Sequence, residues 1–154
     1  GWRIGYAVGP KEVIKKMGLI HDLLYICAPT PLQYAAVTAL AQPDSYYEGL
    51  QHDFLIKRDF LVDSLSVLGF DVAVPQGAYY LMADYSRLNL SSDSDNVTRD
   101  LLEGAKVATV PAKYFYLNEA LSLNKLRFCF ALSQDKLKCA MDQLQEFFKL
   151  EAIC

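Results

Sequence analysis

The sequence has few residues of the types that build metal sites or disulfide frameworks. Its 154 residues include four cysteines and two histidines, and no two cysteines have the Cys-x-x-Cys spacing. This composition predicts neither a zinc site nor a set of disulfides. We therefore expect reduced thiols in a cytoplasmic protein with no bound metal.

The chain also lacks an excess of charge of one sign and a long apolar run. It has 15 basic and 18 acidic residues and a net charge of −3, which gives no electrostatic reason to expect nucleic acid or an anionic membrane as a partner. No uncharged apolar stretch reaches the roughly 18 residues that a membrane-spanning helix needs. The hydrophobic fraction of 53% is instead typical of a folded domain with a core.

Helical spacing of apolar residues and capping signals predict five helices. The first follows Pro10, two begin at the capping boxes Thr30–Gln33 and Ser45–Glu48, and the last follows Ser133. The expected ranges of the first four are 11–24, 30–41, 45–68 and 97–103. Gly69 is expected to end the third, long helix.

Residues that alternate between apolar and small or polar predict strands. Their expected ranges are 1–8, 71–74, 78–83, 107–110 and 126–132. Gly77 is expected to provide the positive φ of a turn, and residues 114–124 are expected to form a loop. The pattern predicts an α/β chain with a small α+β domain, in which a mixed sheet packs against helices. A boundary near Pro43 divides it into 1–42 and 43–154, bridged by the long helix.

Two of the predicted strands contain an arginine on a face that otherwise has small side chains. Arg3 alternates with Trp2 and Ile4, and Arg127 alternates with Leu126 and Phe128. An arginine offers a planar fork of donors that matches a carboxylate or a phosphate. A lone strand arginine more often ends in a surface salt bridge, but two such strands in one chain favour ligand binding.

Four motifs together resemble the C-terminal part of the class I aminotransferases, which use pyridoxal phosphate (PLP). They are Gly1-Trp2-Arg3-Ile4-Gly5-Tyr6, Gly77-Ala78-Tyr79-Tyr80, Val110-Pro111 and Arg127-Phe128. The resemblance covers essentially the whole chain and is to aspartate/kynurenine aminotransferase-like members. The local sequences of residues 27–30 and 127–130 are most similar to the kynurenine and glutamine aminotransferase-like branch. The resemblance implies that residues 1–42 are the end segment of a large PLP-binding domain, and that 43–154 are a small C-terminal domain.

The resemblance also implies roles for single residues. Arg3 is expected to bind the phosphate of PLP, and Arg127 the carboxylate of the substrate. Tyr79 is expected near the substrate side chain, with core packing as an equally weighted alternative. Many relatives have a glycine after Val-Pro where this chain has Ala112, followed by Lys113, in a segment that borders the active site of the family.

No catalytic residue is expected within these 154 residues. In the family, a lysine that binds PLP as a Schiff base precedes the Gly-Trp-Arg motif, and these 154 residues begin after the expected position of that lysine. The nearest lysines, Lys11, Lys15 and Lys16, follow the motif on a solvated helix. We therefore expect a C-terminal fragment, inactive alone, of a homodimeric enzyme that moves an amino group between an amino acid and a 2-oxo acid.

Two alternatives to an aminotransferase stay open. A PLP-dependent lyase or synthase of the same fold can have the same two arginines. A regulator can use an aminotransferase-like domain to bind a ligand without turnover. The segment that precedes this region in the full-length protein distinguishes them, because a lysine there favours an enzyme and a DNA-binding helix-turn-helix favours a regulator.

Overall fold

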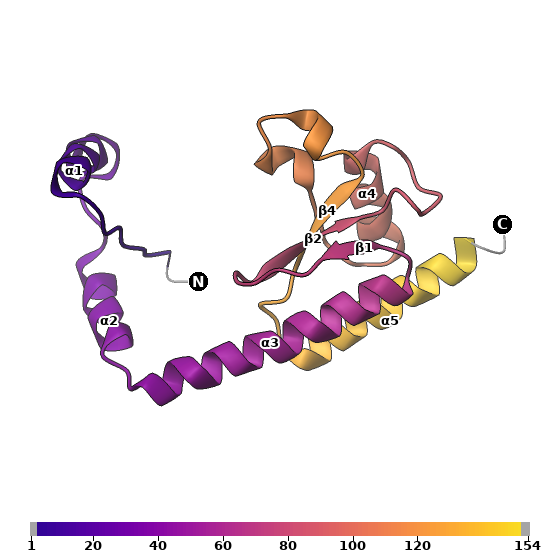
Figure 1. The fold of residues 1–154 in the computed structure, drawn as a ribbon, viewed down its shortest axis with the longest axis horizontal. Helices are drawn as coiled ribbons and strands as arrows, with labels where there is room; N and C mark the ends of the chain where they lie inside the picture. The colour runs from indigo at the N-terminus through magenta and orange to yellow at the C-terminus, as the bar shows by residue number, and fades with distance from the viewer. Residues whose placement is uncertain (1–2, 152–154) are drawn as a thin grey trace. The chain divides into compact units, whose positions relative to one another are not determined.

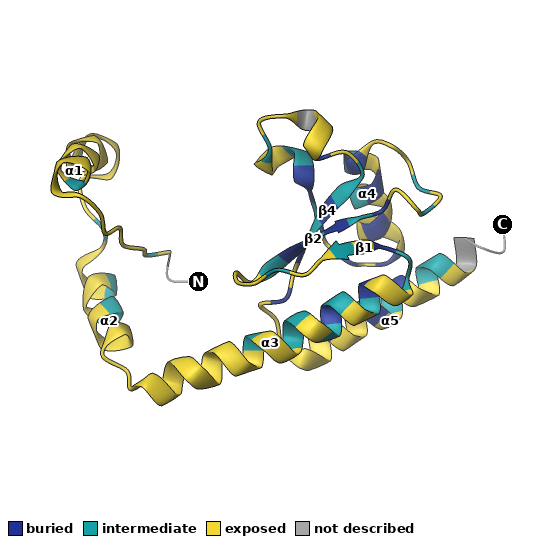
Figure 2. Cartoon of the chain, in the orientation of Figure 1, coloured by how far each residue is buried: buried dark blue, intermediate teal, exposed yellow. Residues whose placement is uncertain are grey.

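The computed structural model describes residues 3–151 and divides into two compact units between Glu48 and Gly49 (Figure 1). The first unit contains helices α1 (Lys11–Tyr25) and α2 (Thr30–Leu40). Neither helix has a buried residue, so the buried core of the described chain lies in the second unit (Figure 2). No helix in the described part of the chain is long and apolar enough to cross a membrane.

The helices of the first unit confirm the predicted ranges but not the predicted capping box. Thr30 is the first residue of α2 rather than its cap, because the carbonyl of Pro29 already accepts from the amides of Leu32 and Gln33. The Gln33 side chain donates to the carbonyl of Ala28 at 2.7 Å. It therefore reaches back to the chain before the helix, as a capping-box glutamine does, but to a carbonyl instead of an amide.

The strand predicted at residues 1–8 is wrong for the part that the structure describes. Arg3–Pro10 has no regular secondary structure, and Arg3 has a φ of 59°, which is incompatible with an extended strand. Gly1 and Trp2 lie outside the described residues. A strand needs a neighbour for its backbone amides and carbonyls, and Arg3–Pro10 pairs with none of the four strands of the sheet.

The second unit is built on a four-stranded sheet with the order β1-β2-β4-β3. Its strands are β1 (Asp71–Ala73), β2 (Tyr80–Asp84), β3 (Val110–Pro111) and β4 (Lys125–Cys129). The α+β class is confirmed, although all three pairings are antiparallel and the sheet is not mixed. Arg127 in the central strand β4 lies opposite Met82 of β2 and Val110 of β3.

Helices cover one face of this sheet. They are α3 (Asp44–Val67), α4 (Ser94–Gly104) and α5 (Gln134–Glu151), and α3 and α5 run side by side in Figure 1. Leu81 and Ala83 of β2 and Leu126 and Phe128 of β4 are buried in one core cluster with residues of all three helices. Because strand side chains alternate, Arg127 points to the opposite face.

Backbone conformation decides where two connections turn. Gly69 has a φ of 96° and follows the end of α3, as predicted. The positive φ before β2 belongs to Ala78, at 65°, and the prediction that Gly77 provides it is wrong. Residues 114–124, predicted as a loop, include the end of one 3-10 helix, η1 (Ala112–Phe115), and the whole of a second, η2 (Glu119–Leu121).

Tyr85, directly after β2, is a buried side chain with an unsatisfied hydroxyl. It is 1% exposed, and its hydroxyl finds no hydrogen-bond partner among the described residues. Burial raises the pKa of Tyr85, and the carboxylates of Asp93 and Asp84 raise it further, against a smaller lowering by Lys113. The hydroxyl therefore stays protonated and costs free energy where it is.

We expect Tyr85→Phe to stabilise the 154-residue chain by about 1 kcal/mol, because the substitution removes a buried polar atom without leaving a partner unpaired. Urea unfolding followed by circular dichroism measures the change. Tyr6→Phe is the control, since Tyr6 is 76% exposed and its replacement should leave the midpoint unchanged. A loss of stability in Tyr85→Phe would show that the hydroxyl has a partner after all.

Candidate carboxylate-binding site

The Arg127 guanidinium lies over two aromatic rings, on the face of the sheet opposite the core. Its Cζ is 5.1 Å from the ring centre of Tyr80 and 4.8 Å from that of Phe115. Both distances lie within the roughly 6 Å over which a cation is attracted to a ring face. Contact with the two rings limits the orientations open to the planar guanidinium.

Three short segments bring these side chains together. Arg127 is the middle residue of β4, where alternation directs it away from the core. Tyr80 is the first residue of β2 and lies opposite Cys129 on β4. Phe115 ends η1, which follows β3 directly, and β3 pairs with β4 at Arg127. The sheet register and one tight turn therefore form the site.

The guanidinium has no anionic partner within the described chain. No ion pair among the described residues includes Arg127, and its Nε is buried without a hydrogen-bond partner. A buried cationic donor without a partner costs free energy. A carboxylate that accepts from the edge of the guanidinium would remove this cost through charge-assisted hydrogen bonds.

Tyr79 lies beside this site rather than in the core. Its side chain is 53% exposed and meets the ring of Tyr80 edge-on, with 5.4 Å between the ring centres. Its carbonyl accepts from the amide of Phe130 at 2.9 Å, which extends the β2–β4 ladder by one bond. Core packing does not account for this side chain, and contact with a substrate stays a prediction.

Arg3, the other predicted ligand, lies in the first unit, whereas Arg127 and Tyr79 lie in the second. The Arg3 side chain is exposed, and no ion pair among residues 3–151 includes it. Its guanidinium is chemically suited to a phosphate. The strand that was expected to orient Arg3 is absent. The Arg3 guanidinium is therefore exposed, and the described residues form no binding site around it.

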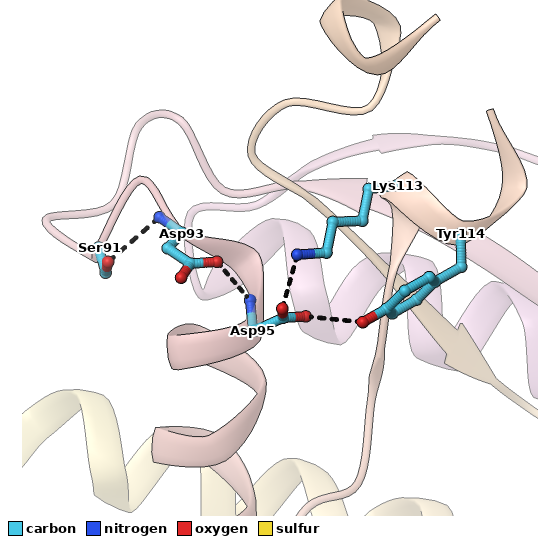
Figure 3. A network of polar contacts seen from close by, with 5 residues as sticks. All are labelled: Ser91, Asp93, Asp95, Lys113 and Tyr114. Atoms are coloured by element: carbon cyan, nitrogen blue, oxygen red, sulfur yellow. Dashed lines mark hydrogen bonds and ion pairs between the residues drawn. The ribbon is translucent and has the colours of Figure 1, made fainter. Parts of the chain in front are cut away.

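A polar network next to the site was not predicted from the sequence. Lys113 of η1 donates to Asp95 at 2.6 Å, and the Tyr114 hydroxyl donates to the other oxygen of the same carboxylate at 3.3 Å (Figure 3). Asp93 caps α4 by accepting from the Asp95 amide at 3.0 Å, and its own amide donates to Ser91. The network attaches η1 to the first turn of α4.

The charges of this network are stable around neutral pH. The hydrogen bond from Lys113 lowers the pKa of Asp95, and the reciprocal bond raises the pKa of Lys113. A lowered carboxyl pKa gives stability that is present above the ordinary carboxyl range and lost as the pH falls through the lowered value. A raised ammonium pKa gives stability that is lost only as the pH rises through the raised value. The pair therefore persists between these limits.

Comparisons with known proteins give one consistent result. The family model described as aminotransferase class I and II matches residues 1–144. The kynurenine–oxoglutarate transaminase of Dictyostelium discoideum is 31% identical over 97% of this chain and 39% of its own length. The aspartate aminotransferase of Geobacillus stearothermophilus is 33% identical over 99% of this chain and 38% of its own length.

A solved structure agrees with the sequence relatives. The N-succinyldiaminopimelate aminotransferase of Mycobacterium tuberculosis matches with a TM-score of 0.83 and 29% identity, over 95% of this chain and 38% of that protein. The 154 residues thus span about two-fifths of the length of the proteins they resemble, with shares of 38–39% in these three comparisons.

Proposed function

The chain belongs to the class I and II aminotransferases, and from this premise we propose that it forms the substrate-carboxylate site of an enzyme that moves an amino group between an amino acid and a 2-oxo acid. The guanidinium of Arg127, which contacts two rings and has a buried Nε without a partner, is the observation that supports this assignment. A two-point contact from Arg127 would fix the α-carboxylate and so orient the reacting carbon.

The family implies PLP as the cofactor, and the residues present suit it in part. The exposed guanidinium of Arg3 would bind the cofactor phosphate, and Tyr79 would lie near the substrate side chain. When bound, PLP supplies an electron sink for the substrate. Tyr80 and Phe115 would contribute through their contacts with the Arg127 guanidinium. We propose none of the described residues as the group that transfers the proton of the substrate.

The proposal concerns a protein longer than these 154 residues, since they span 38–39% of the relatives above. We propose that residues 1–42 belong to the large cofactor-binding domain and 43–154 to the small domain. The family resemblance further supports a homodimer as the active form. The 154-residue chain alone should lack activity, because most of a relative's length is outside it.

The full-length protein, supplied with PLP, is expected to transfer the amino group of aspartate or kynurenine to 2-oxoglutarate, and the 154-residue chain is expected to give no product. A coupled assay for glutamate measures both. The same assay with other amino donors tests the substrate range. If the full-length protein bound amino acids without forming any oxo acid, the ligand-binding regulator would replace the enzyme; release of other products would indicate a lyase or synthase.

A further inference from the structure

We propose that Tyr80 and Phe115 are positioning residues that hold the Arg127 guanidinium edge-on to the substrate, and that the Asp95–Lys113 ion pair keeps Phe115 in place. This inference rests on the proposed function, because it takes Arg127 as the carboxylate ligand. It adds the residues that orient Arg127 and a remote contact that controls one of them.

Contact of the guanidinium with two rings supports the first part of the proposal. An arginine side chain on a solvated face of a sheet loses much rotamer freedom when a ligand immobilises it. Rings at 5.1 and 4.8 Å from Cζ reduce this freedom before the ligand arrives. Neither ring carries a negative charge. The two rings therefore orient the guanidinium without neutralising it. Such preorganisation increases affinity by lowering the cost of binding.

The attachment of η1 supports the second part. Tyr80 belongs to β2, whose register with β4 is fixed by five residue pairs. Phe115 belongs to a four-residue 3-10 helix that has no ladder of its own. Lys113 and Tyr114, the two residues before Phe115, both bond to Asp95 at the start of α4 (Figure 3). The Phe115 ring therefore depends on this carboxylate for its position.

The burial of the residues at the two ends of η1 also supports a positioning role for Phe115. Ala112 at its start is 0% exposed, whereas Phe115 at its end is 49% exposed. The buried alanine fixes the beginning of the turn against the unit, and the polar network fixes its middle. Since half of the Phe115 side chain is in solvent, its contact with Arg127 is not explained by core packing, and its replacement removes little of the core.

The experiment is a calorimetric titration of the full-length protein with succinate, a dicarboxylate that cannot be transaminated. We expect Phe115→Leu to raise the dissociation constant of succinate about five- to tenfold, because one of the two cation–π contacts is lost. Phe115→Tyr keeps the ring and should restore the affinity to within about twofold. Asp95→Asn, which removes the charge from the remote contact, should raise the dissociation constant about two- to fivefold.

Three comparisons separate positioning from a general structural effect. In turnover assays, KM for aspartate should rise more than kcat falls in Phe115→Leu and Asp95→Asn. The binding of succinamide, which has no carboxylate, should be equally weak in all variants. Lys136→Gln removes an exposed lysine elsewhere, on α5, and should change nothing.

The outcomes distinguish this inference from the proposed function. If Arg127→Leu abolishes succinate binding while Phe115→Leu and Asp95→Asn bind it normally, the positioning role is wrong and the carboxylate site stands. If Arg127→Leu itself binds succinate normally, the proposed function of the site is wrong. A Phe115→Leu protein that fails to fold would leave Asp95→Asn, a conservative change at a half-buried residue, to decide the question.

Discussion

An Arg127→Leu variant of the full-length protein is expected to lose about 100- to 1,000-fold in kcat/KM for aspartate, because the substrate carboxylate loses its charged, two-point partner. Arg127→Lys keeps the charge but not the planar fork. We expect it to lose about 10- to 100-fold, between the wild type and Arg127→Leu. Steady-state kinetics over a range of aspartate and 2-oxoglutarate concentrations measure both changes.

The matched control for this prediction is Arg87→Leu. Arg87 is an exposed arginine of the same unit, with its guanidinium 3.6 Å from the carboxylate of Asp71. Surface ion pairs of this kind contribute little, so Arg87→Leu should keep kcat/KM within about twofold. An Arg127→Leu enzyme with normal kinetics would contradict the carboxylate assignment, and an equal loss in Arg87→Leu would indicate a nonspecific effect.

Leu126→Ala is expected to destabilise the 154-residue chain by about 3–4 kcal/mol, because it opens a cavity in the core under β4. Leu126 is 0% exposed and belongs to the cluster that joins the sheet to α3, α4 and α5. Its neighbour Arg127 depends on the same strand for its direction. Because side chains alternate along the five residues of β4, this one strand contributes both to the core and to the site.

Urea unfolding followed by circular dichroism measures this loss. Leu123→Ala is the control, since Leu123 has the same chemistry and is 60% exposed; we expect a change within about 0.5 kcal/mol. A Leu126→Ala chain as stable as the wild type would mean that β4 does not cover the core as described. Because Leu126 points away from Arg127, the same change should affect activity mainly through folding.

The sequence was most informative where a local pattern coincides with burial. The alternation through Leu126, Arg127 and Phe128 predicted which side chains enter the core, and the structure confirms that Leu126 and Phe128 are buried while Arg127 is not. The ligand role of Arg127 stays a prediction. The same alternation failed at Arg3, because a strand also needs a partner strand and the described segment has none. Pattern alone does not supply that partner.

The partners of Arg127 were not predictable from local patterns. Phe115 is 12 residues before Arg127 in a segment with no regular period, and only the pairing of β3 with β4 brings η1 to the site. The contact between Asp95 and Lys113 spans 18 residues and depends on where α4 begins. These contacts are tertiary, and the local patterns of a single sequence do not predict them.

The most direct test of the carboxylate site is the crystal structure of the full-length protein with succinate bound. One succinate carboxylate is expected at about 2.7–2.9 Å from the Arg127 guanidinium, with the rings of Tyr80 and Phe115 still in contact with that guanidinium. Succinate bound elsewhere, with Arg127 paired to a carboxylate of the protein itself, would contradict the assignment of Arg127 as the carboxylate ligand.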